Sequence, residues 1–205
     1  MKTDRSQHLQ FLLLTGLAVA VLLGGCIGKS PPSQFYTLNA IAGPAQGKAL
    51  PQDISIAIGP VTIPPALDRP QIVTRDMANQ VHFSESHRWA GPLDKEIATV
   101  LAANLGSLLA TERVIPYTSE DILQPTHRIH VSIARFDGSL QNEVLLDATW
   151  SIKEANTRQP RLMKKSVIRE TVISPDHDGI VAAKNKALAA LSEQMAESIR
   201  LIVKE

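Results

Sequence analysis

The sequence predicts an α+β domain, a mainly antiparallel sheet with two amphipathic helices packed on one face. Two segments, 91–110 and 174–204, place apolar residues at steps of three and four, which is typical of helices with one buried side. Three segments, 127–136, 143–153 and 161–173, alternate apolar and polar residues, which is typical of strands with one buried face. Such one-sided strands favour an antiparallel sheet whose apolar face is covered by the helices.

The first strands are expected at 34–40 and 53–64, the second of them breaking at Gly59-Pro60. Residues 70–84 are expected to form two short strands around Met77–Asn79. A further short strand is predicted at 113–118, after the first helix.

The first helix carries its expected charges at its start. Pro92 suits the first helical turn, and Asp94 and Glu96 lie where the helix dipole favours negative charge. Its apolar stripe consists of Leu93, Ile97, Val100, Leu101, Leu105 and Leu108. In the three-strand segment, Asp137-Gly138 indicates the first turn of a meander.

The second helix closes the chain. Ser174-Pro175 or Asp178 could cap its start. Its apolar stripe consists of Val181, Leu188, Leu191, Met195, Ile199 and Ile202.

The N-terminal segment has the layout of a secretory signal peptide. A short basic start, Lys2 and Arg5, precedes an almost wholly apolar run from Leu9 to Leu23. The alternative is an uncleaved membrane helix. A spanning helix needs about 20 predominantly apolar residues, whereas this run is shorter and contains Gln10. The signal-peptide interpretation is therefore favoured.

The only cysteine of the chain follows this run. Leu23, Gly24, Gly25 and Cys26 resemble the lipobox of bacterial lipoproteins, in which small residues give the processing enzymes access to the thiol. The resemblance implies cleavage after Gly25, diacylglycerylation of the Cys26 sulfur and acylation of the new amine, which together give stable attachment to membrane lipid. The predicted organisation is a signal peptide (1–25), a lipidated tether (26–34) and a single α+β domain (35–205).

The composition and the absence of known catalytic motifs exclude several classes of function. With 21 Lys and Arg against 20 Asp and Glu, the chain lacks the basic excess expected of a nucleic-acid-binding protein. The sequence contains no glycine-rich phosphate loop, no GxSxG and no HExxH motif. We therefore expect no catalytic residues, no cofactor and no metal site.

The histidines are candidate metal ligands, but their positions argue against a shared metal site. His127 and His130 would lie on opposite faces of one strand, so they cannot share a metal. His177, between two aspartates at a helix start, is better explained as part of a cap or turn. His82 and His87 are expected in a loop, with no carboxylate near them other than Glu85.

A partner surface is the remaining candidate site. Trp89, just before the first helix, is either a hydrophobic staple or, with Arg88 and Arg69, a contact anchor. The proline-containing segment 60–75 also carries Arg75. This segment is either a rigid connection between strands or a docking edge that loses little entropy on binding.

The order of these motifs resembles the PqiC-type ABC-transport auxiliary lipoproteins. The resemblance rests on "FYTL" (35–38), "IAIGPVTIPPALDRPQIVTR" (56–75) and "RWAGPLDKEIATVLAANLGSLL" (88–109), and covers nearly all of the chain after the signal peptide. It implies an outer-membrane lipoprotein that works with an MCE-domain protein bridging the periplasm. It also implies a ring-forming homo-oligomer and no ATPase of its own.

Two alternatives to this docking role remain open. One is a carrier that holds an acyl chain between sheet and helices, which a large apolar cavity would favour. The other is an envelope assembly or secretion lipoprotein without lipid cargo. The residue after Cys26 is Ile27 and not the Asp associated with inner-membrane retention, so the expected location is the periplasmic face of the outer membrane.

Replacing the lipobox cysteine tests the anchor. Cys26→Ser should abolish lipid labelling of the protein and leave precursor, because serine does not replace the thiol in the acyl-transfer step. The measurement is incorporation of radiolabelled palmitate in cells. Since the chain has no other cysteine, normal labelling of this variant would contradict the prediction.

Overall fold

The computed structural model describes residues 32–40, 43, 49–77, 79–119 and 124–204. The elements, in chain order, are β1 (Gln34–Tyr36), β2 (Ile56–Thr62), β3 (Gln71–Met77), β4 (Gln80–Trp89), α2 (Leu93–Leu108), β5 (Val114–Pro116), the short 3-10 helix η1 (Tyr117–Ser119), β6 (His127–Gly138), β7 (Glu143–Glu154), β8 (Leu162–Thr171) and α3 (His177–Lys204). The predicted α+β class is confirmed, and both helices lie where the apolar stripes placed them.

A five-stranded sheet forms the centre of the domain, in the order β5-β2-β6-β7-β8. β6, β7 and β8 form the predicted antiparallel meander. β2, however, pairs in parallel with both β5 and β6, so the sheet is mixed. The reason is topological, because a chain that leaves one strand and returns through a crossover containing a helix, here α2, runs parallel to it.

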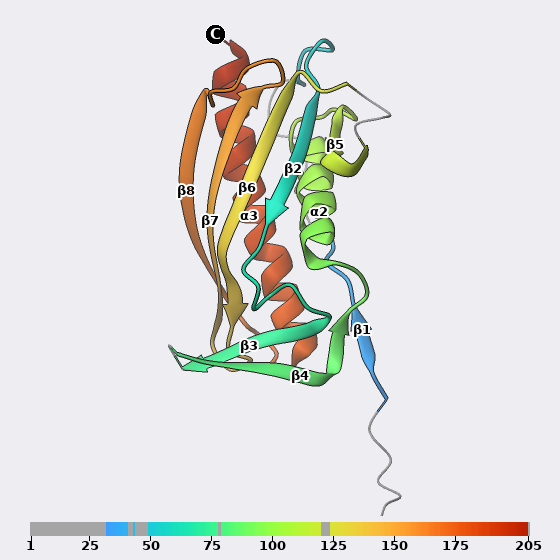
Figure 1. Ribbon diagram of the computed structural model, residues 1–205, viewed down its shortest axis with the longest axis vertical. Coiled ribbons are helices and arrows are strands. Elements are labelled where there is room, and N and C mark those ends of the chain that lie inside the picture. Colours follow the sequence, from blue (N-terminus) through green and yellow to red (C-terminus); the bar gives the residue numbers. More distant parts are fainter. Residues whose placement is uncertain (1–31, 41–42, 44–48, 78, 120–123, 205) are drawn as a thin grey trace, which may run out of the picture. The chain divides into compact units, whose positions relative to one another are not determined.

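The two helices cover one face of this sheet (Figure 1). α2 packs on β2 and β5, α3 packs on β7 and β8, and the helices contact each other. The strand residues that face them are fully or almost fully buried, among them Ile129, Trp150 and Ile152. The indole Nε1 of Trp150 donates to the Ser166 hydroxyl at 2.9 Å, so the largest core side chain leaves no unpaired polar atom.

Gly59-Pro60 interrupts the register of β2 but not the strand. The pairing with β6 shifts between Ile58 and Val61, and Gly59 has a φ of 124°. This region of backbone is open to glycine and strained for other residues. The break predicted at this dipeptide is thus a bulge inside β2, which absorbs the proline without ending the strand.

A second, three-stranded sheet has the order β1-β4-β3. β3 and β4 are the predicted antiparallel pair, but β4 is longer than expected and continues to Trp89. β1 joins the far side of β4 in parallel. Figure 1 shows this small sheet at one end of the domain, beside the start of α3 and the β6–β7 turn.

The predicted segments 1–25 and most of 26–34 lie outside the described residues, so this division of the chain stays a prediction. Among the helices within the described part of the chain, none is long and apolar enough to cross a bilayer.

Charges introduced into the interface between helices and sheet should unfold the domain. Leu101 of α2 and Ile133 of β6 are 0% and 3% exposed. Leu101→Asp or Ile133→Asp should each cost several kcal/mol, a large share of the stability of an ordinary domain. Urea unfolding measures the effect. The control is Thr99→Asp on the exposed side of α2, and a wild-type unfolding curve for either core variant would contradict the assignment.

Candidate functional site

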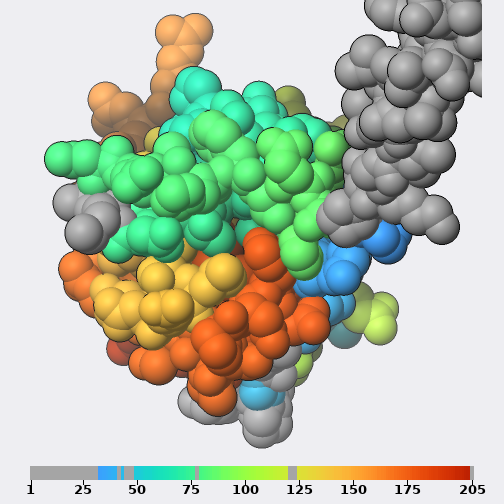
Figure 2. All heavy atoms as spheres, turned by 90° about the horizontal axis from the view of Figure 1, so that it is seen from below, coloured from blue at the N-terminus to red at the C-terminus, as the bar shows by residue number. Residues whose placement is uncertain are grey.

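The candidate site is the end of the domain that carries the small sheet. Figure 2 looks onto this end, where β1, the β3–β4 pair, the β6–β7 turn and the start of α3 form one continuous face. Four residues predicted as partner contacts, Arg69, Arg75, Arg88 and Trp89, belong to this end. The structure gives them unequal exposure and different neighbours.

Arg69 lies on a turn that follows the paired prolines. The amides of Leu67 and Asp68 donate to the Pro64 carbonyl at 2.8 and 3.2 Å, and Leu67 is buried, which anchors the turn. The Arg69 guanidinium carbon lies 3.8 Å from the centre of the Phe83 ring. Phe83 is 39% exposed, so this cation–π contact is worth about 0.5–1 kcal/mol and leaves much of the ring accessible.

Arg88 occupies the centre of the small sheet. It pairs with Phe35 of β1 on one side and Gln71 of β3 on the other. Its Nε, like that of Arg69, is buried and has no hydrogen-bond partner among the described residues. Since buried donors are nearly always paired, two unpaired guanidinium N–H groups at one end of the domain need an explanation.

Arg75 ties the small sheet to the large one. It donates to both carboxylate oxygens of Asp137 at 3.0–3.1 Å, and Arg135 donates to Oδ1 at 2.7 Å. Burial alone would raise the pKa of Asp137, but the hydrogen bonds and charges of Arg75 and Arg135 hold it below its usual value. The ion pair therefore fixes β3 against β6 while Asp137 stays charged.

Trp89 is the last residue of β4 and is 4% exposed. Its amide donates to the Pro70 carbonyl at 2.7 Å. The Nζ of Lys184 lies 5.9 Å from the centre of the indole ring. The indole thus lies beneath the surface on which Arg69 and Arg88 lie.

Lys184 was not among the predicted site residues. It is completely buried, lies 4.1 Å from the centre of the Phe136 ring and donates to the Phe136 carbonyl. Burial lowers its pKa from 10.5 to about 7, against a smaller opposing effect of Asp137. The sequence does hold a signal, because Lys184 falls three residues after Val181 and four before Leu188 on the apolar stripe of α3.

Two histidines were misplaced by the sequence interpretation. His82 and His87 lie in β4 and not in a loop. Nε2 of His82 lies 3.1 Å from a carboxylate oxygen of Asp76 on the neighbouring strand β3. The sequence alone had indicated Glu85 as the only carboxylate near His82. His87 stacks on His177 at the start of α3, with ring centres 3.6 Å apart. Within the described residues, no three His, Cys, Asp or Glu side chains are grouped so as to hold a metal ion.

The predicted lipobox residues, Leu23, Gly24, Gly25 and Cys26, lie outside the described residues. Their roles in processing and lipidation stay predictions.

A family model matches residues 36–196, described as the ABC-type transport auxiliary lipoprotein component. The chain belongs to this family. It is 25% identical over 186 residues to the intermembrane transport lipoprotein PqiC of Escherichia coli K12, covering 90% of this chain and 94% of PqiC, and equally to that of Shigella flexneri. Protein XCC0632 from Xanthomonas campestris has a similar fold, with a TM-score of 0.67 at 14% identity over 84% of this chain and 97% of that one. The crystal structure of an uncharacterized protein is also similar in fold, with a TM-score of 0.66 at 19% sequence identity, covering 82% of this chain and 99% of that one.

The family match covers β4, α2, the meander and most of α3, and so includes the whole candidate site apart from the first two residues of β1. The protein is accordingly an auxiliary lipoprotein of a transport system.

The buried lysine predicts a pH dependence of stability. Because its pKa is about 7 when folded and 10.5 when exposed, the unfolded chain binds more protons between these values. Stability should therefore rise with pH across this window, on the order of 2 kcal/mol between pH 7 and 9. Urea unfolding at both pH values measures the rise, which Lys184→Met should remove. Lys186→Met, on the exposed side of the same helix, should keep it. An undiminished rise in Lys184→Met would contradict the assignment.

Proposed function

We propose that this protein is a non-catalytic, outer-membrane lipoprotein of an MCE-type intermembrane lipid transport system. It is attached by the acylated Cys26 and docks the bridging MCE-domain protein at the periplasmic face. The observation that carries this proposal is the similarity to PqiC, an intermembrane transport lipoprotein, along 90% of the chain. An energy source would then lie in other components, in keeping with the lack of a phosphate-loop motif in the sequence.

The end of the domain that carries the small sheet is the proposed docking surface. Arg69 and Arg88 each have an N–H group that no described residue accepts. Phe35, 66% exposed, and Phe83, 39% exposed, belong to the same small sheet. Arginine and aromatic residues are enriched at the centres of protein interfaces. Arg75 and Trp89 support this surface, since one holds β3 in place and the other lies beneath it.

The space between sheet and helices favours docking over the carrier alternative. An acyl chain would need a long apolar cavity there. Between α3 and the sheet, the space lined by Ile129, Ile152 and Ile199 measures about 10 Å³, enough for about one water molecule. The larger hollows found among the described residues are open to solvent, such as the one of about 460 Å³ beside Arg200.

Self-association is the second part of the proposal. β8 is an edge strand of the large sheet, ten residues long. Met163 and Val167 on this strand are 66% and 49% exposed. An exposed, partly apolar edge is a natural site for pairing with a second copy, and Lys165 and Arg169 on the same strand would restrict which partners pair.

The docking surface is tested by a double variant, Arg69→Ala with Arg88→Ala. Because arginine side chains are enriched at the centres of protein interfaces, capture of the MCE-domain protein from solubilised envelopes should fall at least tenfold, while the melting temperature changes by no more than a few degrees. The measurement is pull-down with identification of the captured proteins by mass spectrometry.

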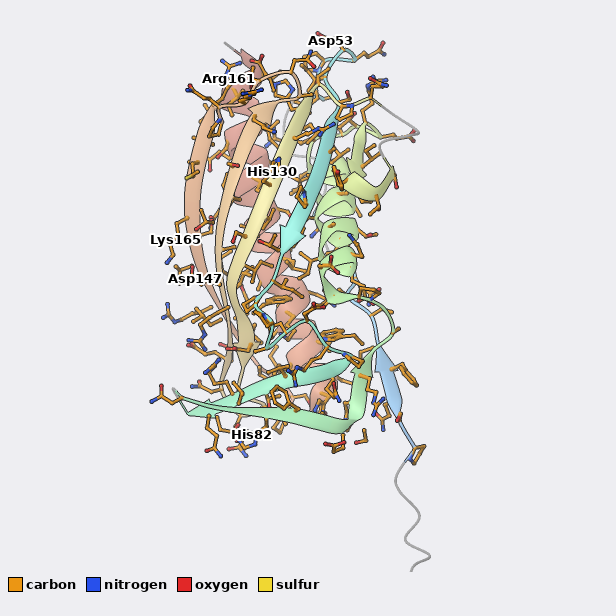
Figure 3. All side chains as sticks on the ribbon, in the orientation of Figure 1. Asp53, His82, His130, Asp147, Arg161 and Lys165 are labelled. Atoms are coloured by element: carbon orange, nitrogen blue, oxygen red, sulfur yellow. The ribbon has the colours of Figure 1, made fainter. Side chains whose placement is uncertain are left out.

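The matched control is Arg161→Ala. Figure 3 shows Arg161 at the opposite end of the large sheet from the small-sheet residue His82. This control should capture the partner normally. Unchanged capture by the double variant would place the docking surface elsewhere, and failure of the wild-type protein to capture any MCE-domain protein would overturn the proposed function.

A further inference from the structure

Three aromatic side chains from three separate elements meet at the small-sheet end of the domain. His87 of β4 and His177 of α3 stack with ring centres 3.6 Å apart and ring planes inclined by 7°. Tyr36 of β1 covers both, at 5.8 Å from His87 and 6.4 Å from His177. We call this group the histidine stack. Neither the family match nor the proposed docking role assigns it a function.

The histidine stack lies where three elements are joined by few other contacts. β1 is only three residues long and pairs only with β4 within the described part of the chain. Beyond β1, the amides of Leu38 and Asn39 donate to Glu96 of α2 and Asn185 of α3 at 2.9 and 3.0 Å. These bonds and the stack hold the segment 34–39 against α2 and α3.

The polar groups around the histidine stack come from all three of the elements that form it. Asp176 and Asp178 flank His177, and the Asp176 carboxylate caps α3 by accepting from the Gly179 amide at 2.7 Å. On the β4 side, the hydroxyls of Ser84 and Ser86 lie 3.0 and 3.1 Å from Nδ1 of His87. β1 contributes the Tyr36 hydroxyl, whose pKa is raised by burial and by the two aspartates, so it stays neutral.

The stack tolerates one proton better than two. Two neutral rings, or one imidazolium on a neutral ring, attract each other at this separation, and either aspartate can balance a single charge. Two imidazolium rings 3.6 Å apart would repel each other strongly. The pKa of His177 is lowered by its burial and then by the charge of His87, more than Asp176 and Asp178 raise it.

We propose that the histidine stack is an acid-sensitive joint, which fastens β1 and the small sheet to the start of α3 at neutral pH and opens when both rings are protonated. Opening of the joint requires only the binding of protons to the two imidazole rings. The unfolded or opened chain binds protons at an ordinary histidine pKa of about 6.5, whereas the closed stack resists the second proton. The joint is therefore fully stable above about pH 6.5 and weakens as pH falls below it.

Hydrogen exchange of the purified full-length chain tests the joint. Protection factors, corrected for the intrinsic effect of pH on exchange, are compared at pH 7.5 and pH 5.0. Protection at Leu38, Asn39 and the first turns of α3 should fall at least tenfold in acid, while the amides of β6 and β7 change less. A uniform change across the domain, or none at these sites, would overturn the proposal.

His177→Phe separates charge from packing. Phenylalanine keeps a ring stacked on His87 but cannot take the second proton, so the acid loss of protection should shrink at least fivefold. The control is His82→Gln, since His82 lies on the same strand but is exposed and pairs with Asp76. This control should respond to acid as the wild type does. If His177→Phe keeps the full acid response, the proposal is wrong.

Titration of the wild-type rings provides a measurement that does not depend on folding of the variants. NMR of the imidazole C–H signals should show His177 taking up its proton at a lower pH than an ordinary histidine, because burial and the neighbouring ring of His87 lower its pKa. Titration of His177 at an ordinary midpoint would overturn the proposal even if the phenylalanine variant failed to fold.

Discussion

The apolar face of the five-stranded sheet is the constraint on which the rest of the structure depends. The helix-facing residues of β2, β6 and β7 are almost completely inaccessible to solvent. They require cover from both helices, because a single helix about 10 Å wide spans only part of a sheet whose strands lie roughly 4.8 Å apart. α2 covers the β5–β2 side and α3 the β7–β8 side. The order of the elements along the chain follows from this requirement. In the sequence α2 comes after β2 and before β5 and β6, the two strands that pair with β2 in parallel.

The uncovered face of the same sheet is mainly polar, apart from Met163 and Val167 of β8. Lys165 of β8 and Asp147 of β7 pair across neighbouring strands at 3.1 Å, and Figure 3 shows both on this side of the meander. Exposed pairs of this kind contribute little to stability. Their alternation with buried residues does fix the register, because a slip by one residue would turn Trp150 toward water and Thr149 toward the helices.

The small sheet contributes buried apolar residues such as Ile72 to the core, but its ion pair with the large sheet joins residues far apart in sequence, and this is where sequence-based prediction met its limit. Arg75 and Asp137 are separated by 62 residues, so no local pattern links them. Read alone, Arg75 has the features of an exposed side chain. The same holds for His87 and His177, which come from different elements and whose stacking depends on how β4 lies against α3. By contrast, the meander and the two helices follow from periodicities of two and 3.6 residues that are complete within each segment. The parallel pairing of β2 was predictable only in part, because the strand itself was predicted from its alternation and its two partner strands were not.

The position of β1 connects the fold to the proposed anchor. Eight residue steps separate Cys26 from Gln34, the first residue of β1. A chain spans at most about 3.3–3.6 Å per residue, so an acylated Cys26 would hold β1 within about 28 Å of the bilayer surface. β1 belongs to the small sheet, whose central strand, β4, carries Arg88 and Phe83. If Cys26 is acylated as proposed, the docking surface would lie on the membrane side of the domain. A partner that spans the periplasm would then have to pass around or through an assembly of copies to contact the docking surface. Self-association through β8 would form such an assembly.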